Sequence, residues 1–241
     1  MLFNFFEEKP VMEFFCRKEY EGTIPEPVPA SKKIADWWKK LPQHDDVKRD
    51  HLGAPMMSAK KCMPIFDAMS YGYVIPLQGD LHVITNGDCS ILKIQHSQHR
   101  KVAEFHDISQ VVGKNAPGYP AKPIKFINFW CIKTAPGWST LFLPLINQFN
   151  NPFTCIGGLV DTDTYVKEVN FPAIWNRPNF DDKLPAGTPL VVAIPVKRKA
   201  SSNKVPIRKI TQKEEEFLYK TQTIQNTRAS YYTNHLRESR K

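Results

Sequence analysis

Two carboxylates stand close together in the middle of the chain, and their types and spacing could support chemistry. Asp161 and Asp163 are separated by one threonine and are followed by Tyr165. Neighbouring carboxylates can act as a general acid and base, or can hold a hard cation through their oxygens. In a hairpin turn, the same side chains would instead bond nearby backbone N–H groups. The flanking strand-like residues favour this structural interpretation. Asp161, Asp163 and Tyr165 remain the catalytic candidates if the protein is an enzyme.

Histidines gather at a second place, where His96, His99 and His106 accompany Glu104. On a helix, the first two rings would share one face and could bind a metal with the carboxylate. On a strand, they would face opposite sides and no site would form. The flanking residues, 91–95 and 102–105, are typical of strands. We therefore predict a solvated turn and no cofactor, and the three histidines are the only metal candidates.

The five cysteines are Cys16, Cys62, Cys89, Cys131 and Cys155. They are odd in number, widely spaced and without a Cys-x-x-Cys pair, which argues against a disulfide framework and a cysteine-rich zinc site. No apolar stretch approaches the length of a transmembrane helix, and no signal peptide is recognisable. We expect a protein without membrane contact, made in a reducing cytoplasm.

Positive charge is concentrated at the C-terminal end. The whole chain has a net charge of +9, and residues 197–241 hold 12 Lys or Arg against four Glu, a net charge of +8. The remaining body is nearly neutral. A basic tail of this kind predicts an acidic partner, either nucleic acid or an acidic protein face, or else a solvated arm.

The elements that must position these residues are mostly short strands, as 20 prolines against 11 glycines indicate. Strands are expected over 2–6 and 12–16, followed by a proline-rich connector over 24–29. Ser31 would cap a short helix that ends before Pro42, with Trp37 and Trp38 on its apolar face. Residues 43–60 are predicted to be irregular.

From Pro64 onward the pattern indicates a β structure. Residues 73–77 and 81–84 flank a Gln-Gly-Asp turn and predict a hairpin. Residues 124–132 are apolar on both faces and predict one central strand. Residues 107–125 are interpreted as a loop, and Asp181 and Asp182 as a solvated turn. Further strands are expected over 90–95, 141–145, 154–156, 159–160, 168–171, 173–175 and 190–196.

After Val196 the composition changes to a basic linker and then to a helical pattern. Thr211 and Glu214 have the spacing of a capping box, which predicts a helix over about 212–236. Apolar residues recur on it every seven positions, so it requires a surface to pack on. The predicted partner-binding residues are Phe217, Ile224, Tyr231, Lys197, Arg198, Lys199, Lys204, Arg208 and Lys209.

Three motifs of the middle stretch occur in an order found in a known fold. They are Gly137-Trp138 before Leu143-Pro144-Leu145, then Gly158-Leu159-Val160-Asp161-Thr162-Asp163-Thr164-Tyr165, and then Leu184-Pro185-Ala186-Gly187-Thr188-Pro189-Leu190. Together they resemble the fold shared by trimeric dUTPases and dCTP deaminases, which is all-β and jelly-roll-like.

In dUTPases the hairpin carboxylate positions a water for attack on the triphosphate, and the tyrosine closes on the deoxyribose. The resemblance assigns these roles to Asp161 and Tyr165, although Tyr165 lies one residue late and Asp163 is extra. The family's Arg-Ser-Gly phosphate turn is replaced here by Leu145-Ile146-Asn147, which lacks the donors that an anion requires. Its glycine-rich C-terminal arm is replaced by a lysine-rich helix. The resemblance therefore supports the fold and weighs against the activity.

The same motifs are also similar to a family of uncharacterised phage and bacterial proteins. That family combines a Pro-Gly-Trp turn, a Gly-x-Val-Asp-Thr-Asp hairpin and a Gly-x-Pro turn. Here they correspond to residues 136–138, 158–163 and 187–189, and the resemblance reaches back to Tyr71-Gly72-Tyr73. It implies no established activity, and it makes a phage origin the expectation.

We expect a mainly β protein with a jelly-roll-like or dUTPase-like body. Its domains would be an N-terminal extension (1–59), the β body (60–198) and a basic linker with a long helical arm (199–241). The leading hypothesis is a non-catalytic structural or assembly protein of a phage particle, made in the host cytoplasm. Its partners would be other virion proteins or copies of itself. The alternatives are a nucleotide-binding protein, in one version a nucleotide hydrolase, and a protein that binds nucleic acid through its tail.

Overall fold

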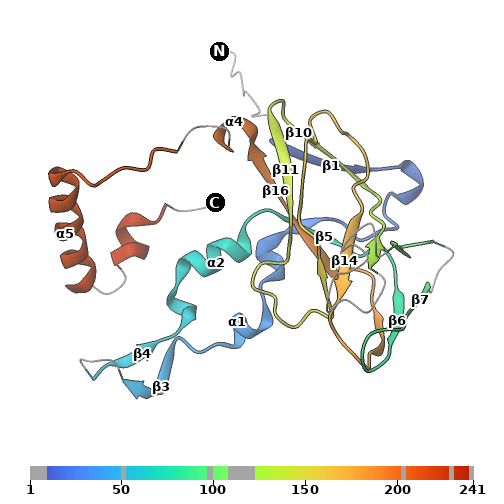
Figure 1. Ribbon diagram of the computed structural model, residues 1–241, viewed down its shortest axis with the longest axis horizontal. Coiled ribbons are helices and arrows are strands. Elements are labelled where there is room, and N and C mark those ends of the chain that lie inside the picture. Colours follow the sequence, from blue (N-terminus) through green and yellow to red (C-terminus); the bar gives the residue numbers. More distant parts are fainter. Residues whose placement is uncertain are drawn as a thin grey trace, which may run out of the picture. The chain divides into compact units, whose positions relative to one another are not determined.

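The computed structural model describes residues 10–49, 53–96, 100–107, 123–201, 205–227 and 231–238, and the chain is mainly β (Figure 1). Its contacts divide it into two units, Met1–Ser201 and Ser202–Lys241. The first unit contains all the strands that the structure describes, and the second contains a helix and a short helical turn. The predicted strand at residues 2–6, most of the predicted loop at 107–125, His99 and Lys204 lie outside the described residues.

The largest sheet has five strands in the order β13-β11-β16-β5-β2. Its members are β13 (Gly158–Val160), β11 (Trp138–Pro144), β16 (Pro189–Lys197), β5 (Tyr73–Pro76) and β2 (Val28–Pro29). All neighbours in it are antiparallel. The longest strand, β16, lies between β11 and β5, which suits its nearly continuous buried apolar sequence.

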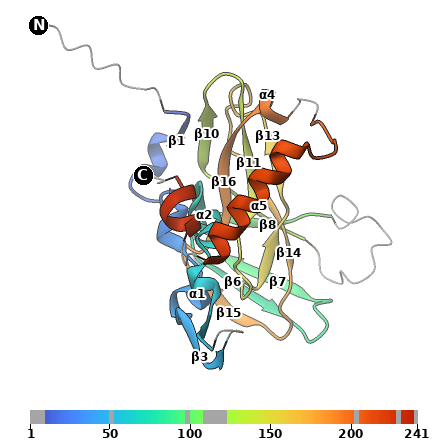
Figure 2. The ribbon, with the colours of Figure 1, turned by 90° about the vertical axis from the view of Figure 1, so that its left-hand side faces the viewer.

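A second sheet has four antiparallel strands in the order β12-β14-β9-β8. These are β12 (Phe153–Cys155), β14 (Phe171–Trp175), β9 (Ile124–Phe126) and β8 (Ala103–Phe105). A third, three-stranded sheet has the order β15-β6-β7, and its β6–β7 hairpin can be followed in Figure 2. Its strands are β15 (Asp181–Leu184), β6 (Leu81–Thr85) and β7 (Leu92–His96).

The two-stranded sheets are β1 (Met12–Cys16) with β10 (Trp130–Thr134), and β3 (His44–Arg49) with β4 (Pro55–Met57).

One apolar core joins strands of several sheets. Phe126, Phe142 and Phe171 are among its largest fully enclosed side chains, and the Phe142 and Phe171 rings lie 5.4 Å apart. These three aromatic residues come from β9, β11 and β14. Burial of side chains of this size contributes about 2 to 3 kcal/mol each, so the core holds the five- and four-stranded sheets together.

The predicted helix that begins at Ser31 is replaced by two shorter pieces. A 3₁₀ turn, η2 (Ala30–Lys33), is followed by α1 (Asp36–Lys40), and Ile34 and Ala35 between them have extended backbone. This break lets both residues become buried beside Met69 of α2 (Met63–Ser70). Tertiary packing thus overrides the helical spacing of the apolar residues. Trp37 and Trp38 pack against the same cluster.

The predicted hairpin between residues 73–77 and 81–84 is wrong. β5 pairs with β16 and β2, whereas β6 pairs with β15 and β7. The intervening residues therefore lead from one sheet to another. Gln78 is buried in this connection, and its amide donates a hydrogen bond to the carbonyl of Pro76. A glutamine buried in this way does not belong to a solvated hairpin turn, and its burial agrees with a connection that runs between two sheets.

The predicted central strand over 124–132 is interrupted. β9 ends at Phe126 and β10 begins at Trp130, and the two belong to different sheets. Between them, Asn128 is buried, its side chain bonds the backbone of Trp130 in both directions, and its own N–H donates to Asn170. The asparagine replaces ladder hydrogen bonds by local ones and so ends the first strand.

Three elements of the first unit differ from the predicted ones. Residues 43–60 contain the β3–β4 hairpin, which projects from the sheets in Figure 1. Residues 63–70 form α2, where β structure was expected. Asp181 and Asp182 belong to strand β15, not to a solvated turn, because they pair with Ile84 and Val83 of β6. The remaining helical elements described in the first unit are the short 3₁₀ turns η1 (Lys18–Tyr20) and η3 (Ala59–Lys61) and the helix α4 (Arg198–Ser201).

The second unit contains α5 (Gln212–Thr227) and a π-helical turn, η4 (Tyr232–Leu236). The predicted capping box is confirmed at the start of α5. The Thr211 Oγ1 accepts from the N–H of Glu214 at 3.4 Å, and Glu214 accepts from the N–H of Thr211 at 2.8 Å. Arg208 also pairs with the Glu214 carboxylate. These bonds satisfy the free donors of the first turn and fix where the helix begins.

Candidate functional site

The segment Asp161 to Tyr165 forms a tight turn directly after β13. The carbonyl oxygen of Asp161 accepts from the N–H of Thr164 at 3.1 Å and of Tyr165 at 2.8 Å. The Thr164 hydroxyl donates to the same oxygen. The turn therefore closes on its own backbone, and it positions the side chains of residues 161–163 against β10 and β11.

The Ala-Pro-Gly-Trp motif is a second turn, located between β10 and β11. The N–H of Trp138 donates to the carbonyl of Ala135 at 3.1 Å, and Gly137 has a φ of +82°. Proline at the second position and a left-handed residue at the third are the pattern of a type II turn. This conformation explains the glycine and points its N–H toward Asp163, which accepts it at 2.9 Å.

Asp163 is paired with Arg198, 35 residues further along the chain, at the first residue of α4 directly after β16. The guanidinium donates to both carboxylate oxygens, at 2.8 and 2.5 Å, and the Asp163 side chain is only 8% exposed. These two bonds and the Gly137 N–H hold the pKa of Asp163 far below its usual range. The carboxylate raises the pKa of Arg198 in turn. With both oxygens occupied and the charge fixed, Asp163 is unsuited to act as a general base.

Asp161 lies at the open side of the same cluster. One of its oxygens accepts from the Ser139 hydroxyl at 2.6 Å and lies 3.5 Å from Arg198. The Asp161 side chain is 59% exposed, in contrast to that of Asp163. The Tyr165 ring is half exposed, and its described cation contact is with Lys167, whose Nζ lies 5.8 Å from the ring centroid. The structure thus brings the two carboxylates together around Arg198 and leaves Tyr165 outside their hydrogen bonds.

Three buried threonines form a directed chain of hydroxyls beneath the turn. The Oγ1 of Thr162 lies 2.8 Å from that of Thr134 and 2.7 Å from that of Thr140. The Thr134 hydroxyl donates its only proton to the carbonyl of Trp138. Thr162 must therefore donate to Thr134, and Thr140 to Thr162. The chain links β10, β11 and the turn in a site without solvent access.

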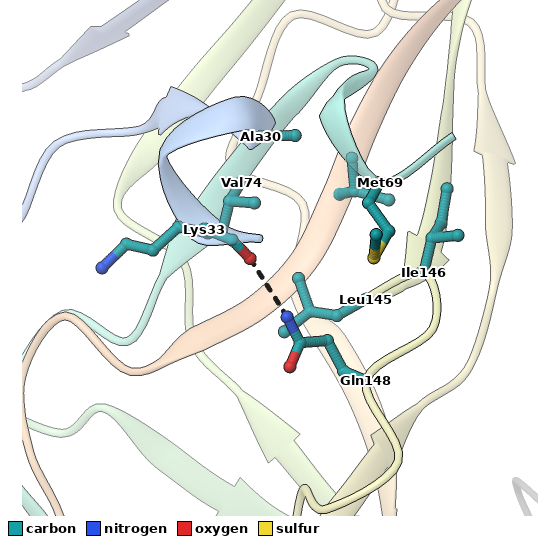
Figure 3. Close-up of a pocket in the computed structure, with 8 residues that line it drawn as sticks. Ala30, Lys33, Met69, Val74, Leu145, Ile146 and Gln148 are labelled. Atoms are coloured by element: carbon teal, nitrogen blue, oxygen red, sulfur yellow. Dashed lines mark hydrogen bonds between the residues drawn. The ribbon is translucent and has the colours of Figure 1, made fainter. Parts of the chain in front are cut away.

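Leu145, Ile146 and Asn147, the residues that stood in place of a phosphate turn in the predicted resemblance, lie in apolar packing. Leu145 and Ile146 pack against the smaller apolar clusters, and the indole N–H of Trp37 donates to the carbonyl of Asn147 at 2.7 Å. A shallow depression, partly open to solvent, lies beside them (Figure 3). Its lining is mainly apolar, and Gln148 donates across it to the carbonyl of Lys33 at 3.0 Å. This lining offers no cluster of donors for a triphosphate.

Ion pairs organise the described part of the histidine region. Glu104 pairs with Lys101 and Lys125, and these two partners lower its pKa to about 2. His96 is at the end of β7, where its Nδ1 accepts from the N–H of Val102, and burial lowers its pKa. The backbone N–H of His106 bonds Pro123. Among the described residues, no three His, Cys, Asp or Glu side chains converge as a metal site would require.

The predicted partner-binding residues are found in different environments. Lys197 ends β16, and Arg198 is committed to Asp163. On the second unit, the side chain of Phe217 is 67% exposed and that of Ile224 is 36% exposed, while Tyr231 contacts His235. Lys199 lies in α4, Lys209 is exposed, and Arg208 is paired with Glu214.

Sequence reasoning identified the carboxylates but missed Ser139 and Arg198, which bind them, and the buried threonines beneath the turn. Ser139, Thr134 and Thr140 lie outside the three motifs, and Thr162 was noted only as part of the hairpin motif. Arg198 was assigned only to the basic tail. The usable signal was the alternation of Ser139, Leu141 and Leu143 with Thr140 and Phe142, which puts polar residues on both faces at one end of β11.

Comparison with known proteins adds no relative to this description. No protein family model matches the chain, and no curated protein matches it. Within the described ranges, no helix is both long and apolar enough to cross a membrane.

Proposed function

We propose that the chain is a non-catalytic structural protein that works in an assembly, and that this assembly is a phage particle. The phage origin rests on the three motifs shared with the phage and bacterial family. Its partners would be other proteins of the virion or copies of itself, and it would be made in the host cytoplasm. We also propose that the body is a jelly-roll-like fold related to dUTPases, which its antiparallel sheets around one core support.

The observation that carries an assembly role is the apolar surface of the second unit. Ile207 is 97% exposed, Val205 82%, Phe217 67% and Leu218 47%. These side chains lie within 14 residues of sequence. So many large apolar groups in contact with water favour a partner that covers them. Segments that order on a partner are common in assemblies, because the partner supplies the burial that the free chain lacks.

The internal use of the carboxylates supports a non-catalytic role. Asp163 accepts from Arg198 and Gly137, and Asp161 accepts from Ser139. A dUTPase-like hydrolase requires an available carboxylate beside a phosphate-binding turn. Here the corresponding turn packs against Trp37. The cluster instead fixes the end of β16, the point from which the basic tail departs.

The test is the composition of particles from the phage or induced prophage that encodes the chain. Mass spectrometry of particles purified through two gradients is expected to find the chain at a constant ratio to the major capsid protein. Its absence from such particles would overturn the proposal. A parallel thermal-shift assay with dUTP and dCTP plus Mg²⁺ is expected to show no stabilisation, whereas a rise in melting temperature would favour the nucleotide-binding alternative.

A further inference from the structure

Strand β13 is an open edge of the five-stranded sheet, and a row of apolar side chains runs toward it. Ile194 of β16 pairs with Leu141 of β11, which pairs with Leu159 of β13. Paired residues of antiparallel strands share one face of the sheet, so these three side chains form a continuous row. Exposure rises along it from 9% at Ile194 to 59% at Leu159. Among the edge strands of the five- and four-stranded sheets, Leu159 is the most exposed large apolar side chain that the structure describes.

The second unit offers a segment suited to such an edge. Residues 205–211 form neither helix nor strand and run as an open stretch into α5 (Figure 1). Val205 and Ile207 are β-branched residues two positions apart, so in a strand both would point to the same face. Neither makes a hydrogen bond within the described part of the chain. Their side chains are the most exposed large apolar groups of the second unit's described residues.

The edge and the segment are complementary in shape and charge. Nothing lies within 4 Å of the position that a Cβ would take at Gly158, so the face of the sheet beside Leu159 is open there. Pro206 lacks an N–H, which an edge strand tolerates. Beyond the edge, Asp161 is 59% exposed, and one of its oxygens accepts no hydrogen bond from the residues that the structure describes. Lys209 is an exposed cation three residues after Pro206.

We propose that residues 205–210 of one copy add as a strand to the β13 edge of a second copy. In a strand that runs parallel to β13, Ile207 would extend the row Ile194, Leu141 and Leu159, and Lys209 would face Asp161. This inference names the partner for the assembly role proposed above and rests on it. The contact joins two different surfaces, so it is head-to-tail and forms either closed rings or open chains.

The oligomeric state of the full-length chain tests this contact. Sedimentation velocity over a concentration series is expected to show self-association of the unaltered protein. Ile207→Asp and Leu159→Asp should each raise the dissociation constant by about tenfold or more, because each puts a charge in the centre of a small apolar contact. Val47→Asp makes the same change at a side chain that is 88% exposed on β3, and it should leave the association unchanged. Circular dichroism melts establish that all three variants fold.

A mixture of the two defective variants provides the decisive measurement. The Ile207→Asp protein retains an intact edge, and the Leu159→Asp protein retains an intact segment. Mixed together, they should form a one-to-one dimer and nothing larger, although each alone is a monomer. Failure of the mixture to dimerise would overturn the head-to-tail contact, as would association that neither substitution weakens.

A monomeric unaltered protein would also overturn this strand addition. That result is distinguishable from failure of the proposed function, because detection of the chain in purified particles would still support a role in the virion with other proteins as its partners.

Discussion

Thr162 lies at the centre of the buried hydroxyl chain, and its side chain both accepts and donates there. Replacing it with valine keeps the shape but leaves the Thr140 proton without an acceptor. We expect Thr162→Val to lower the free energy of unfolding by about 1 to 3 kcal/mol, the usual cost of an unsatisfied buried polar group. Urea denaturation, with the slope m checked for constancy, measures this loss.

The direction of the hydrogen bonds along the three hydroxyls supplies a matched control. Thr140 stands at the donor end, so Thr140→Val removes one hydrogen bond and leaves Thr162 still donating to Thr134. It should therefore cost less than Thr162→Val. Equal losses, or a larger loss for Thr140→Val, would contradict the assigned direction.

The contribution of Glu104 to the stability of the protein depends on pH. Lys101 and Lys125 lower its pKa from 4.5 to about 2. A depressed carboxyl pKa contributes stability that is fully present above the unfolded-state value and is lost as the pH falls through the folded-state value. For Glu104 this window extends from about pH 4.5 to pH 2. We expect Glu104→Gln to reduce the difference in melting temperature between pH 6 and pH 2.5.

Other carboxyl groups with a lowered pKa, such as Asp163, Asp80 and Asp88, also make stability depend on pH. Part of the difference in melting temperature therefore remains in the Glu104→Gln variant. Glu26→Gln is the control, because Glu26 is exposed and makes no ion pair within the described part of the chain. Its pH dependence should match that of the unaltered protein. An unchanged slope in Glu104→Gln would show that the lysine pairs are not formed in solution.

At the scale of elements, α5 provides two threonines with opposite roles. Thr211 accepts from the N–H of Glu214 at the start of the helix, whereas Thr221 lies inside it and bonds the carbonyl of Phe217. Thr211→Ala should destabilise the helix by about 1 kcal/mol through loss of the cap. Thr221→Ala should stabilise it by about half a kcal/mol, because alanine is the better helix former.

Hydrogen exchange of α5, followed by mass spectrometry, checks both signs in one experiment. Residues 212–220 should exchange faster in Thr211→Ala and more slowly in Thr221→Ala than in the unaltered chain. Identical exchange in the two variants would mean that the capping box does not determine where this helix begins.

Local signals predicted the elements that carry a clear local pattern. The capping box at Thr211 and Glu214 and the strand over 12–16 were confirmed, and the mainly β character followed from composition. Two features without such a pattern, which depend on distant partners, were missed. β15 is a strand because it pairs with β6, nearly 100 residues away, although its own residues are polar. The change of sheet after Pro76 likewise depends on β16.

The difference between local patterns and distant partners also separates the predicted and missed parts of the candidate site. A hairpin with Asp161 and Asp163 was expected from neighbouring residues. Their binding to Arg198 depends on the register of β11 between β13 and β16, in which Trp138 pairs with Lys197. No local pattern encodes that register. The sequence therefore indicated two available carboxylates, whereas the fold uses one of them in a nearly enclosed ion pair.

At the scale of the whole molecule, Arg198 determines how far the chain can be shortened from its C-terminal end before the first unit loses stability. A chain that stops at Ser201 keeps the Asp163 pair, and one that stops at Lys197 leaves that nearly buried carboxylate without its cation. We expect the first chain to melt within about 2 °C of the full-length protein and the second about 5 °C or more lower. Differential scanning calorimetry compares the three. Adding Asp163→Asn to the shorter chain should recover part of the loss, because it removes the unpaired charge. Equal melting temperatures for the two truncated chains would show that Arg198 does not stabilise the first unit.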